Sequence, residues 1–600
     1  MFSESVRAAK VLLAALLGVG AFTMPAMAQL DFTTFQFGTS TITTVTGIRG
    51  NNMTGNYSIA NSGGDTGGLL LTPSFGNVQP FPVATASGSN FPGATSSTPY
   101  GPSFGSPTGI LRVVGSFKTA ASNLDLGYLY DGAASPGRQI TPLIYPGGAT
   151  LNTIAHSNFG NQVVGNYDTR LATGNAFVYD IPSGTFTTNN KPGAVSTTAY
   201  GVYGNRIAGG YTDPGPGGLT HAYIYTQSTG AFTTYDAPGA TVVTHFEGIT
   251  GGGRSNEYNL VADSVDALGQ VHAWAVHVVD SGAATWTEIA VPGGSVTSAN
   301  SIYGNTVIGV YVQDGVTRAY SVNVPGLYNP ITNTGTLAVN TANMAAITGA
   351  AGDDILNSGS ILAGGVNGVG VSSNSYSVVN NTGVISATGI GGTAVQMAGS
   401  FGSLLNAGLI HAGPGAVAIG TTPTSIGTLV VNNGVIDGPV AIAAGPYARF
   451  ENSGWLGVSS AGAGITHAIS GTFAQTSAGT LALRVGANGT SDTLLVNGQA
   501  RLAGTAVAAF QPGAALSNSY TLLTATGGFT GNFAALSTRN LASFLTASLN
   551  YSGSNVTLNL QSSLAAPAGL GGDQISVGRA LDWAFNAGPG LGGMPGLFGL

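Results

Sequence analysis

Side chains that could carry chemistry are few and scattered along this 600-residue sequence, which has 23 acidic residues, 16 Lys or Arg, and no Cys. A Gly-x-Ser-x-Gly match spans 101–105 in a loop rich in Ser, Pro and Gly. The nucleophile elbow of a hydrolase needs a strand before this motif and a helix after it, and we expect neither here. The sequence therefore predicts no catalytic residues.

The His and acidic residues also suggest no metal or paired-acid site. His272 and His277 are five residues apart in an expected strand, so their side chains point to opposite faces and cannot share a metal. Asp353 and Asp354 follow a turn glycine, where a solvated turn is favoured over calcium, which takes six or more oxygens. Glycoside hydrolysis needs two placed carboxyl groups, and no acidic cluster stands out. We expect no metal, no cofactor and no enzymatic activity; a secreted glycan-cleaving enzyme is the alternative.

The composition indicates repetitive β structure. Only 6% of the residues are charged, 43% are hydrophobic and 95 are Gly. Turns use Gly and Asn, while strands use β-branched and aromatic residues. With more acidic than basic residues, the chain lacks the cationic surface that nucleic acid requires. Nucleic acid is therefore excluded as a partner.

The N-terminus predicts export. Arg7 and Lys10 precede an apolar run over 11–22, and Ala26-Met27-Ala28 has the small-x-small pattern of a cleavage site. We interpret residues 1–28 as a signal peptide cleaved between Ala28 and Gln29. The apolar run is shorter than the roughly 20 residues of a spanning helix. The expected location is the periplasm in transit, then the outer membrane, the cell surface or the medium.

Six repeats follow, with phrases such as "YGVYGNRIAGGY" (200–211) and "SIYGNTVIGVY" (301–311). Strand-like phrases such as "HAYIYT" and "GAFTTYD" come after them, and the repeats recur every 44 to 60 residues. This period predicts four-stranded propeller blades. The sixth copy lacks its last strand, which the segment Phe32, Thr33, Thr34 and Phe35 resembles. We expect a six-bladed β-propeller over residues 29–326, closed by this segment.

A second period begins near residue 327. Asn-x-Gly phrases between short strands recur every 20 to 26 residues, which predicts a right-handed parallel β-helix over 327–460. Stacked Asn side chains are expected to bond to one another, and Gly to serve positions of left-handed backbone. The pairs are Asn333 and Gly335, Asn357 and Gly359, Asn381 and Gly383, Asn406 and Gly408, Asn432 and Gly434, and Asn452 and Gly454.

Two resemblances bear on function. The "HAYIY" and "AFTTYDAPGA" phrases resemble the HAF-type extracellular repeats of bacterial proteins. The phrases at 471–485, 491–510, 519–533 and 549–560 resemble, in order, the C-terminal passenger region of bacterial autotransporters. That resemblance implies a cap that assists folding over 461–561. It also implies that the helix-like segment in 562–600 leads toward a translocator barrel, which is absent from this chain.

The fold class expected is therefore all-β: a propeller, a β-helix, a cap and a short linker helix. The expected function is that of an autotransporter passenger on the cell surface. The β-helix would be the stalk, and the propeller the head that binds a host cell, a neighbouring cell or a glycan through exposed Tyr and Trp. The chain is interpreted either as a truncated autotransporter or as a passenger whose anchor is supplied separately.

Overall fold

A computed structural model describes residues 30–81, 93–170, 174–280, 282–443, 445–459 and 462–587. The expected signal peptide and its cleavage site at Ala28 and Gln29 lie outside the described residues. The chain divides into two compact units. Unit 1 contains residues 1–104, 112–131 and 137–329, and unit 2 contains 105–111, 132–136 and 330–600.

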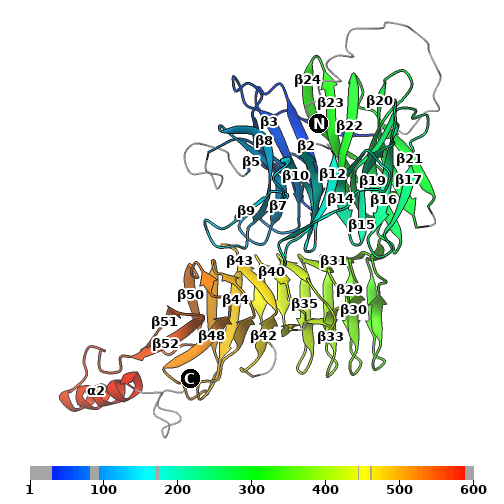
Figure 1. Cartoon of the computed structure of the whole chain (residues 1–600). Coiled ribbons are helices and arrows are strands. Elements are labelled where there is room, and N and C mark those ends of the chain that lie inside the picture. The colour runs from blue at the N-terminus through cyan, green and yellow to red at the C-terminus, as the bar shows by residue number, and fades with distance from the viewer. Residues whose placement is uncertain are drawn as a thin grey trace. The chain divides into compact units, whose positions relative to one another are not determined.

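The described residues of unit 1 form six sets of four antiparallel strands (Figure 1), and a parallel pair between Thr220 and Val243 joins the fourth and fifth sets into one eight-stranded sheet. The first three sets are β2 (Thr43–Arg49), β3 (Asn52–Ser58), β4 (Thr66–Leu71) and β5 (Val78–Pro80); β6 (Ala94–Pro102), β7 (Arg112–Thr119), β8 (Ser122–Asp131) and β9 (Ile140–Leu143); β10 (Thr150–Phe159), β11 (Gln162–Thr169), β12 (Asn175–Asp180) and β13 (Thr185–Thr188). The next two are β14 (Ser196–Tyr203), β15 (Arg206–Thr212), β16 (Thr220–Thr226) and β17 (Ala231–Tyr235); β18 (Val243–Gly251), β19 (Glu257–Val265), β20 (Val271–Val279) and β21 (Ala284–Ile289). The sixth contains β22 (Val296–Tyr303), β23 (Thr306–Gln313), β24 (Val316–Asn323) and β1 (Phe32–Phe35).

The repeated Gly-Asn phrase forms the turn between the first two strands of most sets. Gly160 and Gly204 have φ of 57° and 58°, a left-handed conformation that glycine adopts without strain. Tight turns of this kind join antiparallel neighbours, and Phe159 pairs with Gln162 across the first of them. The repeat phrase therefore specifies a hairpin.

The sixth set joins the start of unit 1 to its end. Strand β1 pairs antiparallel with β24, so that Phe32 lies opposite Val322 and Phe35 lies opposite Ala319. The ring of Phe32 also meets the ring of Tyr320 edge to face at 5.5 Å. The four residues from Phe32 to Phe35 thus supply the fourth strand of the last repeat.

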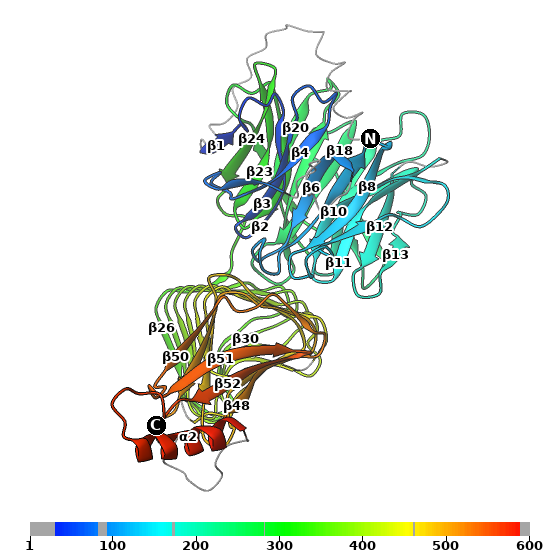
Figure 2. The same ribbon diagram turned by 90° about the vertical axis from the view of Figure 1, so that its left-hand side faces the viewer.

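Unit 2 is a parallel β-solenoid with three sheets along its length; its coils are seen nearly end on in Figure 2. One sheet contains β25 (Ile331–Asn333), β28 (Ile355–Asn357), β31 (Val378–Asn381), β34 (Ser403–Asn406), β37 (Leu429–Asn432), β40 (Ala448–Asn452), β43 (Gly471–Gln475), β46 (Ala500–Arg501) and β49 (Phe529–Thr530). Another contains β26 (Thr336–Val339), β29 (Ser360–Ala363), β32 (Val384–Ala387), β35 (Leu409–Ala412), β38 (Val435–Asp437), β41 (Trp455–Gly457), β44 (Thr480–Val485), β47 (Thr505–Phe510) and β50 (Ala535–Arg539). The third contains β27 (Ala345–Thr348), β30 (Val369–Ser373), β33 (Thr393–Met397), β36 (Val417–Thr421), β39 (Val440–Ile442), β42 (Thr466–Ile469), β45 (Thr493–Val496), β48 (Ser519–Ala525), β52 (Asn555–Ser562) and β51 (Leu545–Ser552).

The Asn side chains of the Asn-x-Gly phrases form one buried ladder inside the solenoid. Nδ2 of Asn333 donates to Oδ1 of Asn357 at 2.7 Å, and the same bond repeats from rung to rung up to Asn452. Asn452 then donates to Oε1 of Gln475 at 3.0 Å. Each amide thereby satisfies the next one in the interior, where an unpaired polar group would be costly.

The glycines of these phrases serve a different purpose from the one expected. They are not in the left-handed backbone region. Instead, a Cβ on Gly383 would lie 2.1 Å from the carbonyl oxygen of Gly359, and one on Gly408 would lie 2.1 Å from that of Gly383. Glycine is required because successive rungs approach one another too closely for any side chain.

Parallel rungs continue beyond residue 460, through the segment 461–561 that was expected to cap the β-helix. Strand β43 follows β40 in register, and β50 still pairs parallel with β47. The Asn-x-Gly phrase ends at Gly454, although the coils do not. The parallel sheet ends where β52 pairs antiparallel with β48 and forms a hairpin with β51.

The single helix described, α2 (Gly572–Ala587), packs on this end of unit 2. Its buried residues are Gly578 and Phe585, whereas Val577 is 60% exposed. Asp582 fixes the helix by accepting bonds from the N–H groups of Leu564 and Ala565. No helix among the described residues has the length and apolar character to cross a membrane.

Candidate functional site

The first strand of each set, called its inner strand here, has a β-bulge after the second to fourth paired residue counted back from the end of that strand; these strands are β2, β6, β10, β14, β18 and β22. A bulge leaves one residue without a partner on the adjacent strand and turns its side chain away from the regular alternation, which is why bulges often mark functional sites. The six bulged residues, called the bulge ring here, are Thr46, Tyr100, His156, Tyr200, Glu247 and Asn300.

Small residues after the bulges let neighbouring inner strands come close together. A Cβ on Gly47 would lie 1.8 Å from the carbonyl oxygen of Tyr100, and one on Gly101 would lie 2.8 Å from that of His156. The bulged side chains of adjacent strands are consequently brought side by side.

One part of the bulge ring is an arc of aromatic side chains. The rings of Tyr100 and His156 meet edge to face with centroids 4.8 Å apart, and His156 lies 4.3 Å from Tyr200. Tyr200 in turn contacts the ring of His245 at 4.6 Å. Nδ1 of His245 lies 3.0 Å from Oε1 of Glu247, which continues the arc as a carboxylate.

The other part of the bulge ring is made of small polar side chains that bond to backbone. Thr46 donates its hydroxyl hydrogen to the carbonyl of Pro99 at 2.6 Å. Asn300 donates from Nδ2 to the carbonyl of Val45. Hydrogen bonds therefore join the sixth, first and second strand sets, and aromatic contacts join the second to the fifth.

His156 is held neutral by its neighbours. Oδ1 of Asn166 accepts the N–H of Ala199 at 2.8 Å, so its Nδ2 faces Nε2 of His156 at 3.2 Å. Because an amide nitrogen only donates, Nε2 must accept and the ring proton must be on Nδ1. Burial, reinforced by the nearby charge of His245, lowers the pKa of His156 to about 3.

Asp263 is held by hydrogen bonds from the sixth strand set. The Ser298 hydroxyl donates to Oδ2 of Asp263 at 2.5 Å, and the N–H of Ala299 donates to Oδ1 at 3.0 Å. Burial and, next, the charge of Glu247 raise the pKa of Asp263.

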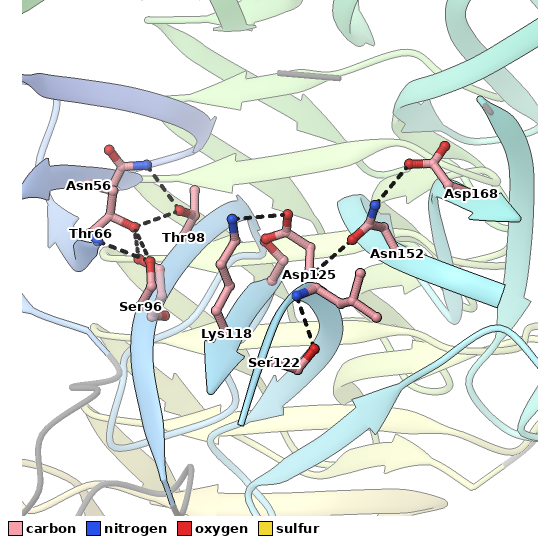
Figure 3. Close-up of polar contacts among 12 residues, drawn as sticks. Asn56, Thr66, Ser96, Thr98, Lys118, Ser122, Asp125, Asn152 and Asp168 are labelled. Atoms are coloured by element: carbon pink, nitrogen blue, oxygen red, sulfur yellow. Dashed lines mark hydrogen bonds and ion pairs between the residues drawn. The ribbon is translucent and has the colours of Figure 1, made fainter. Parts of the chain in front are cut away.

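A polar layer connects the strand sets beside the bulge ring (Figure 3). Nδ2 of Asn56 donates to Oγ1 of Thr98 at 3.2 Å, joining the first set to the second. The N–H of Asp125 donates to Oδ1 of Asn152 at 2.9 Å, joining the second to the third. Lys118 lies 3.6 Å from Asp125, whose pKa is nevertheless raised, chiefly by burial.

His221 and His272 fall outside the bulge ring. His221 contacts Asp236 and Asp213 through its two ring nitrogens at 2.7 and 3.2 Å. Its two nitrogens point in opposite directions, so these carboxylates do not converge on one point with it. His272 makes the equivalent contacts, at 2.7 Å with Glu288 and 3.5 Å with Asp266.

The Gly-x-Ser-x-Gly match at 101–105 follows a strand, although none was expected there. Strand β6 does precede it, ending at Pro102, although no helix follows. The Ser103 hydroxyl accepts the N–H of Arg112 at 2.8 Å and donates to the carbonyl of Phe104 at 2.9 Å. These bonds tie Ser103 into the backbone of the adjoining strand.

The aromatic residues expected on the surface of the head are also placed differently. Trp274 is 8% exposed, and its indole meets that of Trp286 edge to face. The partly exposed aromatic residues of the bulge ring, Tyr100 and Tyr200, were not singled out in the sequence. Position in the repeat is the signal that could have revealed them. Tyr200, for example, lies four residues before Gly204 of the Gly-Asn turn and is followed directly by a Gly.

Comparison with known proteins gives a fold-level likeness only. No protein-family model and no curated protein matches the sequence. Among solved structures, a Trypanosoma rangeli sialidase is 12% identical with a TM-score of 0.30, covering 48% of this chain and 54% of its own. An Aleuria aurantia lectin bound to α-methyl-L-fucoside is 10% identical with a TM-score of 0.29, covering 47% of this chain and 90% of its own. The chain thus spans about half the length of the sialidase it matches.

These matches correct one expectation. The sequence was interpreted as that of a protein without enzymatic activity, but the similar structures include sialidases, which are enzymes, and that interpretation is wrong as it stood. It rested on the lack of an acidic cluster, whereas folding brings Glu247 close enough to Asp263 to raise its pKa. At a TM-score of 0.30 the likeness assigns no activity to this chain.

Proposed function

We propose that this protein is an exported surface-binding protein in which unit 1 is a six-bladed propeller and binds a ligand at the bulge ring. Its support is the bulge that recurs in the inner strand of all six strand sets. Pairing of β1 with β24 supports closure of these sets into one circle. In a closed circle, the bulged side chains would surround the central axis.

The observation that carries the binding role is the variety of side chains at equivalent positions. A position that serves only the fold tends to keep one residue type from repeat to repeat, as the Asn ladder of unit 2 does. The bulge ring instead has five residue types at six positions, and Tyr100, Tyr200 and Glu247 stay partly exposed. Such variety is what a site that recognises one ligand requires.

Unit 2 is proposed to be the stalk of an autotransporter passenger, wound as a right-handed β-helix. Its support is the parallel solenoid with its buried Asn ladder, together with the resemblance of residues 471–560 to autotransporter passengers. The residues expected to be a signal peptide supply the route of export. A translocator barrel in the outer membrane is the proposed anchor, and host cells, neighbouring cells or glycans are the proposed binding partners.

The test is display and binding. Intact cells that express the gene are treated with proteinase K. The protease should degrade unit 1 and leave a periplasmic control protein intact, because it cannot cross the outer membrane. Purified chain should then bind cells saturably, and the double variant Tyr200→Ala and Glu247→Ala should lose this binding. The variant Tyr447→Ala is the control, because Tyr447 is 49% exposed in unit 2. Protection of unit 1 on intact cells, or unchanged binding by the double variant, would contradict the proposal.

A further inference from the structure

We propose that the bulge ring recognises an uncharged sugar residue, whose apolar face packs on the Tyr200 side of the aromatic arc and whose hydroxyl groups bond to Glu247. This inference rests on the proposed binding role and gives it a ligand chemistry. It follows from three features of the ring: its aromatic surface, its carboxylate and its distribution of charge.

The aromatic arc supplies a surface that is held in place. Tyr200 lies between His156 and His245, and the contacts to both rings restrict its side chain. Tyr200 is nevertheless partly exposed, although burial raises the pKa of its hydroxyl well above the usual range. A rigid aromatic ring with an accessible face binds apolar C–H surface with little loss of conformational entropy, and a pyranose presents such a surface.

Glu247 supplies the hydrogen-bond acceptors. Its side chain is 17% exposed, and its Oε1 lies 3.0 Å from Nδ1 of His245. A carboxylate has about four acceptor positions, which suits a pair of adjacent hydroxyl groups. Hydrogen bonds to a charged acceptor are also stronger than those between neutral groups.

The distribution of charge excludes acidic sugars. The bulge ring contains a carboxylate and no Lys or Arg, and His156 is neutral. The nearest cation of the adjoining polar layer, Lys118, faces the carboxylate of Asp125 at 3.6 Å. A sialic or uronic acid would place its own carboxylate in this field without a cation to pair with it, so a neutral sugar is favoured.

The experiment is titration calorimetry of the full chain with methyl glycosides of glucose, galactose, mannose, fucose and N-acetylglucosamine, and with sialic acid, glucuronic acid and glucosamine. At least one uncharged glycoside should bind, with at least tenfold greater affinity than sialic acid or glucuronic acid. Tyr200→Ala and Glu247→Gln should each weaken binding about tenfold or more. Tyr200→Phe keeps the ring and should bind within about threefold of the parent.

Variants are compared only after their melting curves show a folded chain, and Tyr447→Ala serves as the matched aromatic control in unit 2. Preference for a charged sugar, no binding of any sugar, or equal binding by Tyr200→Ala and Tyr447→Ala would overturn the inference. Saturable binding to cells that depends on the bulge ring, but is not inhibited by sugars, would overturn the inference and leave the proposed binding role intact. Protection of unit 1 from protease on intact cells would contradict the proposed surface location and would leave the sugar inference untouched.

Discussion

Asn166 determines which nitrogen of His156 carries the proton. The Nδ2 of Asn166 lies 3.2 Å from Nε2 of His156, and its amide cannot flip because Oδ1 accepts the N–H of Ala199. A single side chain thus joins two strand sets and fixes the tautomer of a bulge-ring residue. The same repeat position is occupied by Asn56 in the first set and by Asp263 in the fifth, each of which also reaches the next inner strand.

His156 should make unit 1 sensitive to acid. Its pKa in the folded chain is about 3, well below the ordinary value near 6.5, so only the unfolded chain takes up this proton between those values. The contribution of neutral His156 to the free energy of unfolding is fully present above pH 6.5 and decreases as the pH falls toward 3. At pH 4.5 the loss is about 2 to 3 kcal/mol. His156→Gln should reduce the difference between unfolding free energies at pH 7.5 and 4.5, measured by hydrogen exchange of β11, whereas His411→Gln in unit 2 should not. Equal pH dependence in His156→Gln and the parent would show that this residue is not the acid-sensitive group.

Asp263→Asn should stabilise unit 1 at alkaline pH. The raised pKa of Asp263 means that its contribution is present at low pH and is lost as the pH rises through the folded value. Asn keeps the geometry and cannot ionise, so the variant should match the parent near pH 5 and exceed it at pH 9 by more than about 1 kcal/mol. The reciprocal variant Asn166→Asp should lose stability as the pH rises. Chemical denaturation at the two pH values measures both, and a parent chain with no relative loss at pH 9 would show that Asp263 is ionised.

Gly383→Ala should disrupt unit 2, and Gly335→Ala should not. The new methyl group at 383 would meet the carbonyl oxygen of Gly359 at 2.1 Å, whereas one at 335 would have nothing within 4 Å. Neither residue is in the left-handed region, so backbone conformation does not separate them. We expect a loss of about 3 kcal/mol or more for the first and less than about 0.5 kcal/mol for the second. Similar urea midpoints for the two variants would contradict close stacking of the rungs.

Deletion of Asp31 to Thr41 should lower the melting temperature of unit 1. This removes β1 and leaves the backbone of β24 without its partner from Val322 to Ala319. We expect a decrease of about 5 °C or more, measured by Trp fluorescence. Thr33→Ala leaves the strand in place and changes only an exposed side chain, so its melting should match the parent. An unchanged transition in the deletion variant would mean that β1 does not close the unit.

The sequence made the repeating elements predictable because each repeat carries the same local signals. Gly-Asn turns between alternating residues indicate hairpins, and Asn at a fixed spacing indicates a ladder. The Asn-x-Gly phrase does not mark the later coils, because Gln475 replaces Asn in the ladder and donates to the carbonyls of Gly479 and Ala503. Parallel pairing between rungs continues where the sequence no longer contains the Asn-x-Gly phrase.

The bulge ring was not predicted for a reason that is also physical. A functional position in a repeat protein differs from repeat to repeat, so a search for recurring phrases passes over it. Glu247 and Asp263 are on separate strands, and their interaction depends on the cross-strand register that places His245 opposite Asp263. The small residue that follows each bulge is the part of the pattern that does recur.

The most direct test of the account is a crystal structure of the full chain with the uncharged glycoside that binds most tightly in calorimetry. Recognition at the bulge ring predicts electron density for the sugar against the ring of Tyr200, with hydroxyl groups within hydrogen-bonding distance of Glu247. Density for the sugar elsewhere on the protein, with the bulge ring unchanged from the free chain, would contradict it.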